Sequence, residues 1–200
     1  MLCILIQTSI FGHNQRHFNN IFRVMNQFCV SAQIFVFSPF ILPSQSNLKF
    51  TQIQIYSVLT LKRTLNGIRP NNANEYVFAY VTGHSAKNGL KFMYKEYFNL
   101  NFFFQLFQNN QMVLIVDSCY SERIINGYQS KYNKHLYISS AKKNEESYAA
   151  QMDEFGIYQS TWLVQELMTL KGNITEFVGK WNAQIAVRGN VEIARQFFSE

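Results

Sequence analysis

The chain has 200 residues, of which 48% are hydrophobic and 15% charged, a composition typical of a folded globular domain with an ordinary core. Lysine and arginine outnumber the acidic residues by 18 to 12, but adjacent basic residues occur only at Lys62-Arg63 and Lys142-Lys143. Because no basic stripe could follow a phosphate backbone, we expect no nucleic-acid partner. We predict a single domain over residues 1–200.

Short apolar runs along the chain predict five β-strands. They cover residues 2–8, 33–37, 76–82, 112–117 and 135–139. Each run is mostly apolar, as expected of strands that are covered on both faces. Segments of helical period alternate with them, which predicts an α/β protein with a largely parallel sheet and helices on its faces. No apolar run approaches the roughly 20 residues of a membrane helix, so we expect no membrane span.

The first segment of helical period covers residues 15–30. Its apolar side chains recur at helical spacing and predict a crossover helix that packs on the sheet; they are Phe18, Ile21, Phe22, Met25 and Phe28. Further helices are predicted at 96–109 and 157–170, and one or two short helices within 173–200. The segments 42–47 and 69–75 are rich in Pro, Asn and Ser and predict loops.

The three cysteines are Cys3, Cys29 and Cys119. They lie in apolar surroundings without a C-x-x-C pair, which indicates neither a zinc site nor a disulfide framework. At least one thiol must be unpaired, because the number is odd. We predict no metal and no cofactor.

Three chemically capable residues follow predicted strands. His84 lies in "TGHS" after strand 76–82, Cys119 lies in "DSC" after strand 112–117, and Asn14 lies in "FGHNQRH" after strand 2–8. Ligands of open α/β sheets bind beyond the carboxyl ends of the strands. These residues are therefore candidates for one site.

A thiol becomes a nucleophile when an imidazole takes its proton, and a third group can orient that imidazole. Cys119, His84 and Asn14 could supply these three groups. Taken alone, a cysteine after a strand is more often a small hydrophobic residue, and a histidine after glycine is more often a turn residue. Their positions after two strands of one sheet, separated by enough chain for a helical crossover, favour the catalytic interpretation.

Three segments resemble a known family. "YVTGHSAKNGLKF" (80–92), "LIVDSCYSE" (114–122) and "ISSAKKNEESYA" (138–149) look like the His strand, the Cys strand and the pocket segment of the legumain-type cysteine peptidases. The match is nearest to the GPI-transamidase branch, which has T-G-H-G-G followed by L-K-F, D-T-C, and N-Y-R-H where this chain has "NQRH". The resemblance covers nearly all of residues 2–170.

The resemblance implies a caspase-like three-layer sandwich with a mostly parallel sheet in the strand order 2-1-3-4-5. It implies that His84 and Cys119 form a catalytic dyad, that Asn14 orients the histidine, and that the backbone amides of Ser85 and Cys119 donate to the oxyanion. The family's Gly-Gly after the histidine is replaced by Ser85 and Ala86. An amide survives this change, but the loop conformation survives only if neither residue needs a positive φ.

Four further residues match the substrate pocket of the family. Arg16 and Asp117 correspond to pocket residues, and Ser139 and Ser140 correspond to serines of the pocket wall. Arg16 could instead pair with a carboxylate, and Asp117 could instead hold loop amides. Serine is common in loops, so the two serines carry less information.

The function that the resemblance implies is acyl transfer in the endoplasmic reticulum. The thiol would cleave the C-terminal signal peptide of a proprotein and pass the acyl group to the amine of a GPI glycolipid, with other transamidase subunits as partners. Two departures bear on such assembly: residues 38–47 replace an acidic, cysteine-containing loop, and we expect neither a leader nor a membrane anchor here. The alternatives are a legumain-like or caspase-like endopeptidase that uses water, and an inactive scaffold subunit of the same fold. Residue chemistry alone supports thiol-dependent amide cleavage.

Overall fold

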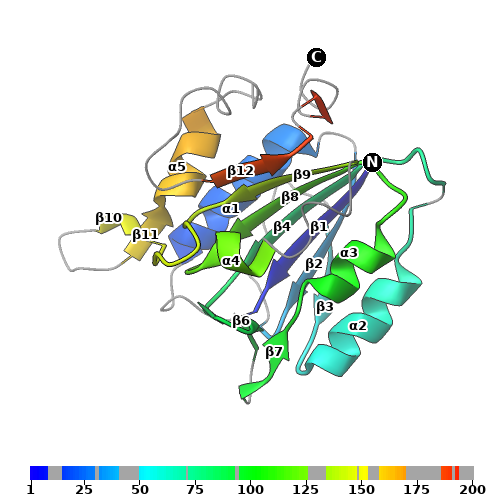
Figure 1. Cartoon of the computed structure of the whole chain (residues 1–200), viewed down its shortest axis with the longest axis horizontal. Coiled ribbons are helices and arrows are strands. Elements are labelled where there is room, and N and C mark those ends of the chain that lie inside the picture. The colour runs from blue at the N-terminus through cyan, green and yellow to red at the C-terminus, as the bar shows by residue number, and fades with distance from the viewer. Residues whose placement is uncertain are drawn as a thin grey trace.

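The computed structural model describes residues 1–8, 15–29, 32–40, 50–70, 72–92, 95–125, 134–147, 149–152, 158–169, 186–190 and 192–193. Within these ranges a seven-stranded sheet has the order β12-β9-β8-β4-β1-β2-β3 (Figure 1). The strands are β1 (Leu2–Gln7), β2 (Gln33–Ser38), β3 (Phe50–Gln54), β4 (Val77–Thr82), β8 (Met112–Asp117), β9 (His135–Ser139) and β12 (Ala186–Gly189).

The five predicted strands are β2, β1, β4, β8 and β9, and they pair in the predicted order, all parallel. The α/β fold class is therefore confirmed. The sequence analysis missed both edge strands: β3 pairs with β2 in parallel, and β12 pairs with β9 antiparallel. β12 lies within 173–200, so the expectation of helices there was wrong for residues 186–189.

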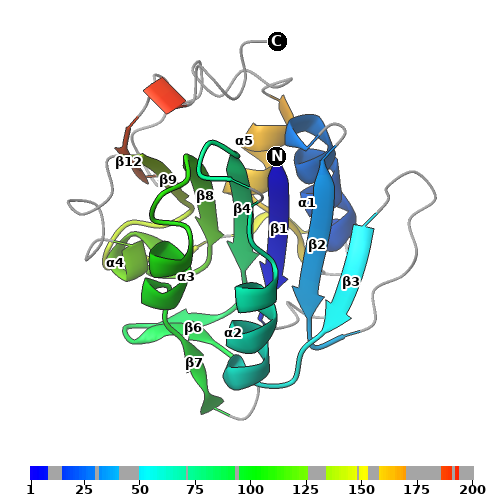
Figure 2. The same ribbon diagram turned by 90° about the vertical axis from the view of Figure 1, so that its right-hand side faces the viewer.

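Alternate residues of each central strand face opposite layers of helices. Cys3 and Leu5 of β1 pack in one hydrophobic cluster with α1 (Gln15–Phe28) and α5 (Trp162–Thr169). Ile4 and Ile6 pack in another, with α2 (Val58–Gly67), α3 (Asn101–Leu106) and α4 (Ser121–Ile125). Figures 1 and 2 show these two helical layers on either side of the sheet. The chain is a three-layer α/β sandwich.

Local hydrogen bonds explain why two helices are shorter than predicted. α5 begins at Trp162, because the Thr161 hydroxyl accepts the backbone N–H of Val164 at 3.1 Å and caps the helix. α3 begins at Asn101, whose N–H donates to the Asn99 side chain at 2.8 Å, and its N-cap residue Leu100 makes no side-chain cap bond. The residues before each start, Tyr158–Thr161 and Tyr97–Phe98, form the short strands β11 and β7.

A disulfide bond joins Cys3 in β1 to Cys29 after the end of α1, with an S–S distance of 2.11 Å. The sequence analysis was wrong to treat these cysteines as unpaired. It could not detect the bond, because 26 positions separate the two residues. The crossover helix runs back along the sheet and brings its last turn over the start of β1. Cys119 is the free cysteine.

Two small sheets complete the described structure. β5 (Ser85–Ala86), β6 (Gly89–Lys91) and β7 form a three-stranded antiparallel sheet that begins at the tip of β4. β10 (Ala149–Met152) and β11 form a hairpin. In Figure 2, β6 and β7 lie beyond the carboxyl ends of the central strands. No helix within the described ranges is long and apolar enough to cross a membrane.

Candidate active site

The tips of β4 and β8 bring the predicted dyad to one edge of the sheet. The two strands are parallel neighbours, and Thr82 is paired with Asp117 at their last position. His84 and Cys119 each follow two residues later. The two turns touch, because the Ser85 hydroxyl donates a hydrogen bond to the backbone carbonyl of Cys119. His84 is exposed and Cys119 is half-buried.

The turn that carries His84 does not need the family's two glycines. Ser85 and Ala86 form strand β5, paired with Leu90 and Gly89, and neither has a positive φ. Gly83, directly before the histidine, has the unusual φ of 146°. The Lys91 N–H closes the hairpin on the His84 carbonyl at 2.7 Å. Serine and alanine are therefore compatible with the observed backbone.

The turn that carries Cys119 is held by the loop that follows β9. Tyr120, directly after the cysteine, has a φ of 54°, which is uncommon for a bulky residue. Its N–H donates to the Glu145 carbonyl at 2.8 Å. The Ser121 hydroxyl accepts the N–H of Ala141 at 2.9 Å. Strained backbone of this kind clusters at functional sites, where neighbouring structure holds it in place.

The structure describes the side chains of only some of the predicted site residues. Ser139 and Ser140 are buried at the end of β9, and the Ser140 hydroxyl accepts the N–H of Ser118 at 3.0 Å. Both serines lie beside the cysteine turn. Asn14 is outside the described residues. Arg16 lies in α1, and its side chain is outside the description. The roles of these residues in catalysis and substrate binding remain predictions.

The surroundings of Cys119 favour the protonated thiol over the thiolate. Burial is the largest influence and raises its pKa, and the nearby carboxylates of Glu146 and Asp117 act in the same direction. The backbone amide of Ser147 acts in the opposite direction and lowers the pKa. A base is therefore needed to generate a thiolate at neutral pH.

Asp117 lies beneath this turn and is fully buried. Its carboxylate accepts hydrogen bonds from the hydroxyls of Tyr80 and Thr161, each at 2.7 Å, and of Ser147 at 3.4 Å. Tyr80 comes from β4, and Thr161 caps α5. The sequence analysis did not single out these three hydroxyl groups, and nothing in the spacing of the sequence links Thr161 to Asp117.

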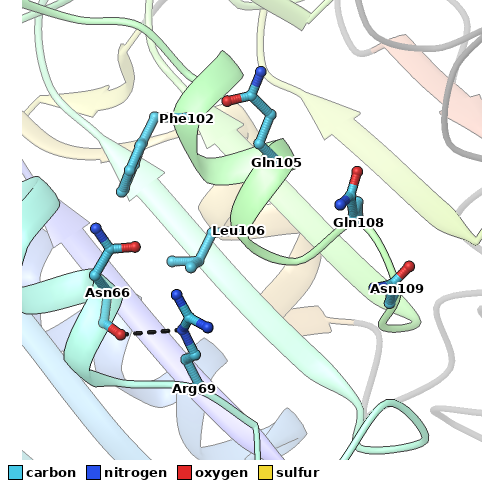
Figure 3. Close-up of a pocket in the computed structure, with 7 residues that line it drawn as sticks. All are labelled: Asn66, Arg69, Phe102, Gln105, Leu106, Gln108 and Asn109. Atoms are coloured by element: carbon cyan, nitrogen blue, oxygen red, sulfur yellow. Dashed lines mark hydrogen bonds between the residues drawn. The ribbon is translucent and has the colours of Figure 1, made fainter.

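A hollow of about 360 Å³ lies beside α2 and α3 (Figure 3). It is lined by Asn66, Arg69, Phe102, Gln105, Leu106, Gln108 and Asn109. These residues come from the ends of α2 and α3, toward the edge of the sheet where β4 and β8 begin. The lining contains no cysteine, histidine or carboxylate, so it offers no nucleophile and no general acid or base.

Comparison with known proteins defines the class. The profile of the Peptidase C13 family matches residues 47–176, a range that includes both His84 and Cys119. The chain belongs to the Peptidase C13 family, the family of legumain-type cysteine peptidases and transamidases. Among solved structures, it is similar to Raptor from Chaetomium thermophilum, with 11% sequence identity and a TM-score of 0.48 over 73% of this chain and 16% of that chain. Comparison with curated protein sequences gave no match.

Proposed function

We propose that this chain is a cysteine acyl transferase in which Cys119 is the nucleophile and His84 is its general base. The observation that carries this proposal is the contact between the two strand tips, where Ser85 next to the histidine hydrogen-bonds to the carbonyl of the one free cysteine. Family membership supplies the expected chemistry. The raised pKa of the thiol explains why a base is required.

The reaction begins when His84 takes the proton of Cys119. The thiolate attacks the carbonyl carbon of the scissile amide, and the backbone amides of Ser85 and Cys119 donate to the oxyanion. As the carbon–nitrogen bond breaks, His84 returns the proton to the leaving amine, and a thioester remains on Cys119. An acceptor then loses a proton to His84 and attacks the thioester, which releases the acyl product and the thiol. Asn14 orients the imidazole.

The acceptor we propose is the amine of a GPI glycolipid, and the donor is the C-terminal signal peptide of a proprotein. The likeness of "YVTGHSAKNGLKF" to the transamidase branch supports this over hydrolysis. Arg16, Asp117, Ser139 and Ser140 would contribute to the substrate pocket, and other transamidase subunits would assemble with the chain. The Cys3–Cys29 disulfide supports an oxidising compartment, such as the endoplasmic reticulum.

A second candidate is an inactive scaffold of the same fold. The observation that favours it is the raised pKa of the Cys119 thiol, since two carboxylates and burial all oppose thiolate formation. The extended backbone of Ser85 and Ala86 argues against it, because the exchange of two glycines has not strained the histidine turn.

Labelling with an electrophilic peptide probe tests the proposal. We expect the native protein to be labelled once, at Cys119, and Cys119→Ala to be folded but neither labelled nor active. Labelling that requires unfolding would support the scaffold. Adding hydrazine to the turnover assay separates the two enzymatic outcomes: an acyl hydrazide product supports transfer, and an unchanged free acid product supports a peptidase that uses water.

A further inference from the structure

A buried hydroxyl network connects the core of the sheet to the nucleophile. We propose that Tyr80 and Thr161 are positioning residues for the thiol, and that they act through the carboxylate of Asp117. This inference rests on the proposed function in one respect, that Cys119 is the reacting group. It assigns roles to two side chains that do not touch the substrate.

Hydrogen bonds tie Asp117 to β4 and to the start of α5. Tyr80 of β4 and Thr161 at the start of α5 both donate to one carboxylate oxygen, at 2.7 Å each. Tyr80, Thr161 and Asp117 are all buried. Hydrogen bonds to a charged acceptor are stronger than neutral ones, and a buried carboxylate that loses a donor has no water to replace it. The two hydroxyls therefore fix the position of the carboxylate.

The other carboxylate oxygen faces the segment over the thiol. The Ser147 hydroxyl donates to it at 3.4 Å, and the backbone amide of the same serine lowers the pKa of the Cys119 thiol. The neighbouring residue Glu145 accepts the N–H of Tyr120 at 2.8 Å, which holds this segment to the cysteine turn. The carboxylate thus anchors one end of the segment that is hydrogen-bonded to the cysteine turn.

The structure distinguishes this arrangement from ordinary core packing. Tyr80 lies in the hydrophobic cluster between the sheet, α1 and α5. Its hydroxyl reaches the one carboxylate that lies two residues before the nucleophile. Thr161 also caps α5, so the same oxygen links the start of that helix to the site.

Alkylation of Cys119 by iodoacetamide as a function of pH tests the proposal. Alkylation reports on Cys119 alone, because the other two cysteines form a disulfide. Tyr80→Phe should loosen Ser147 and raise the pKa of the thiol, which slows alkylation below that pKa by about three- to tenfold. At pH values above the pKa, the rates of variant and native protein should converge.

Matched controls separate positioning from stability. Tyr137→Phe removes another buried hydroxyl, which bonds at 2.9 Å to His135 at the start of β9 and lies in the other hydrophobic cluster, and should leave the alkylation profile unchanged. Thr161→Val should slow alkylation as Tyr80→Phe does, and Thr161→Ser should restore the native profile. If Tyr80→Phe does not fold, the Thr161 pair decides.

Native profiles for both Tyr80→Phe and Thr161→Val would overturn the proposal, as would an equal shift in Tyr137→Phe. The test does not depend on turnover. A native protein that is alkylated normally but neither cleaves nor transfers a peptide would contradict the proposed function and leave the positioning inference standing.

Discussion

Two buried polar residues lie at opposite ends of the central sheet and differ in what surrounds them. Asp117 ends β8 and bonds to the Tyr80 hydroxyl at 2.7 Å. His135 begins β9 and bonds through its ring nitrogens to the Tyr137 hydroxyl at 2.9 Å and the Phe107 carbonyl at 3.1 Å. Asp117 lies beneath the free thiol of Cys119, where the turns after β4 and β8 contact each other. His135 packs against Phe104.

This difference shows that a perturbed buried group does not by itself mark a site. Burial lowers the pKa of His135 to about 4, a large perturbation, yet no nucleophile adjoins it among its described contacts. Asp117 gains its importance from its position at the carboxyl end of a strand, where loops gather. We expect substitutions at the two ends to separate chemistry from stability.

The largest effect should follow the loss of His84 at the reactive end. His84→Ala should reduce the turnover of a fluorogenic peptide by about 10² to 10⁴, because the imidazole both activates the thiol and protonates the leaving amine. Asn14→Ala should cost less, since the dyad remains but is poorly aimed. Rate constants under single-turnover conditions measure both changes. Equal losses in the two variants would contradict the orienting role of Asn14.

Removing the Cys3–Cys29 disulfide changes neither the surroundings of Asp117 nor those of His135 directly. The double variant Cys3→Ala/Cys29→Ala should lower the free energy of unfolding by about 3.5 kcal/mol, as expected for a closed loop of 26 residues. Urea unfolding measures this change, and the alkylation profile of Cys119 should keep its native shape. Three titratable thiols in the unfolded, unreduced native chain would show that the bond does not form.

At the other end, His135 should make stability depend on pH. Its pKa is lowered to about 4 in the folded state, from 6.5. The unfolded chain therefore binds a proton first as pH falls, so this contribution is complete above pH 6.5 and is lost progressively toward pH 4. The change should reach about 3 kcal/mol. Urea unfolding at several pH values should show a flatter dependence for His135→Gln, and parallel curves would contradict the assignment.

The sequence predicted the sheet well, because its central strands are long apolar runs that must be covered on both faces. Val113 to Val116 is such a run, and it forms the middle of β8. The edge strand β3 was missed, since three of the five residues in its sequence, FTQIQ, are polar and the strand is partly exposed. β12 was missed for a related reason, because it joins the sheet only through its pairing with β9. Edge strands depend on their neighbours more than on their own pattern.

By itself the sequence determined which residues follow the strand ends, and so placed His84 and Cys119 as candidates at one edge. That inference needs only the parallel direction of the strands. Only the tertiary structure decided which groups gather beneath the thiol, the hydroxyls of Tyr80, Thr161 and Ser147 on Asp117, and that Cys3 bonds to Cys29. These contacts join residues far apart in the chain, and side-chain reach in the folded core decides them, which no local pattern records.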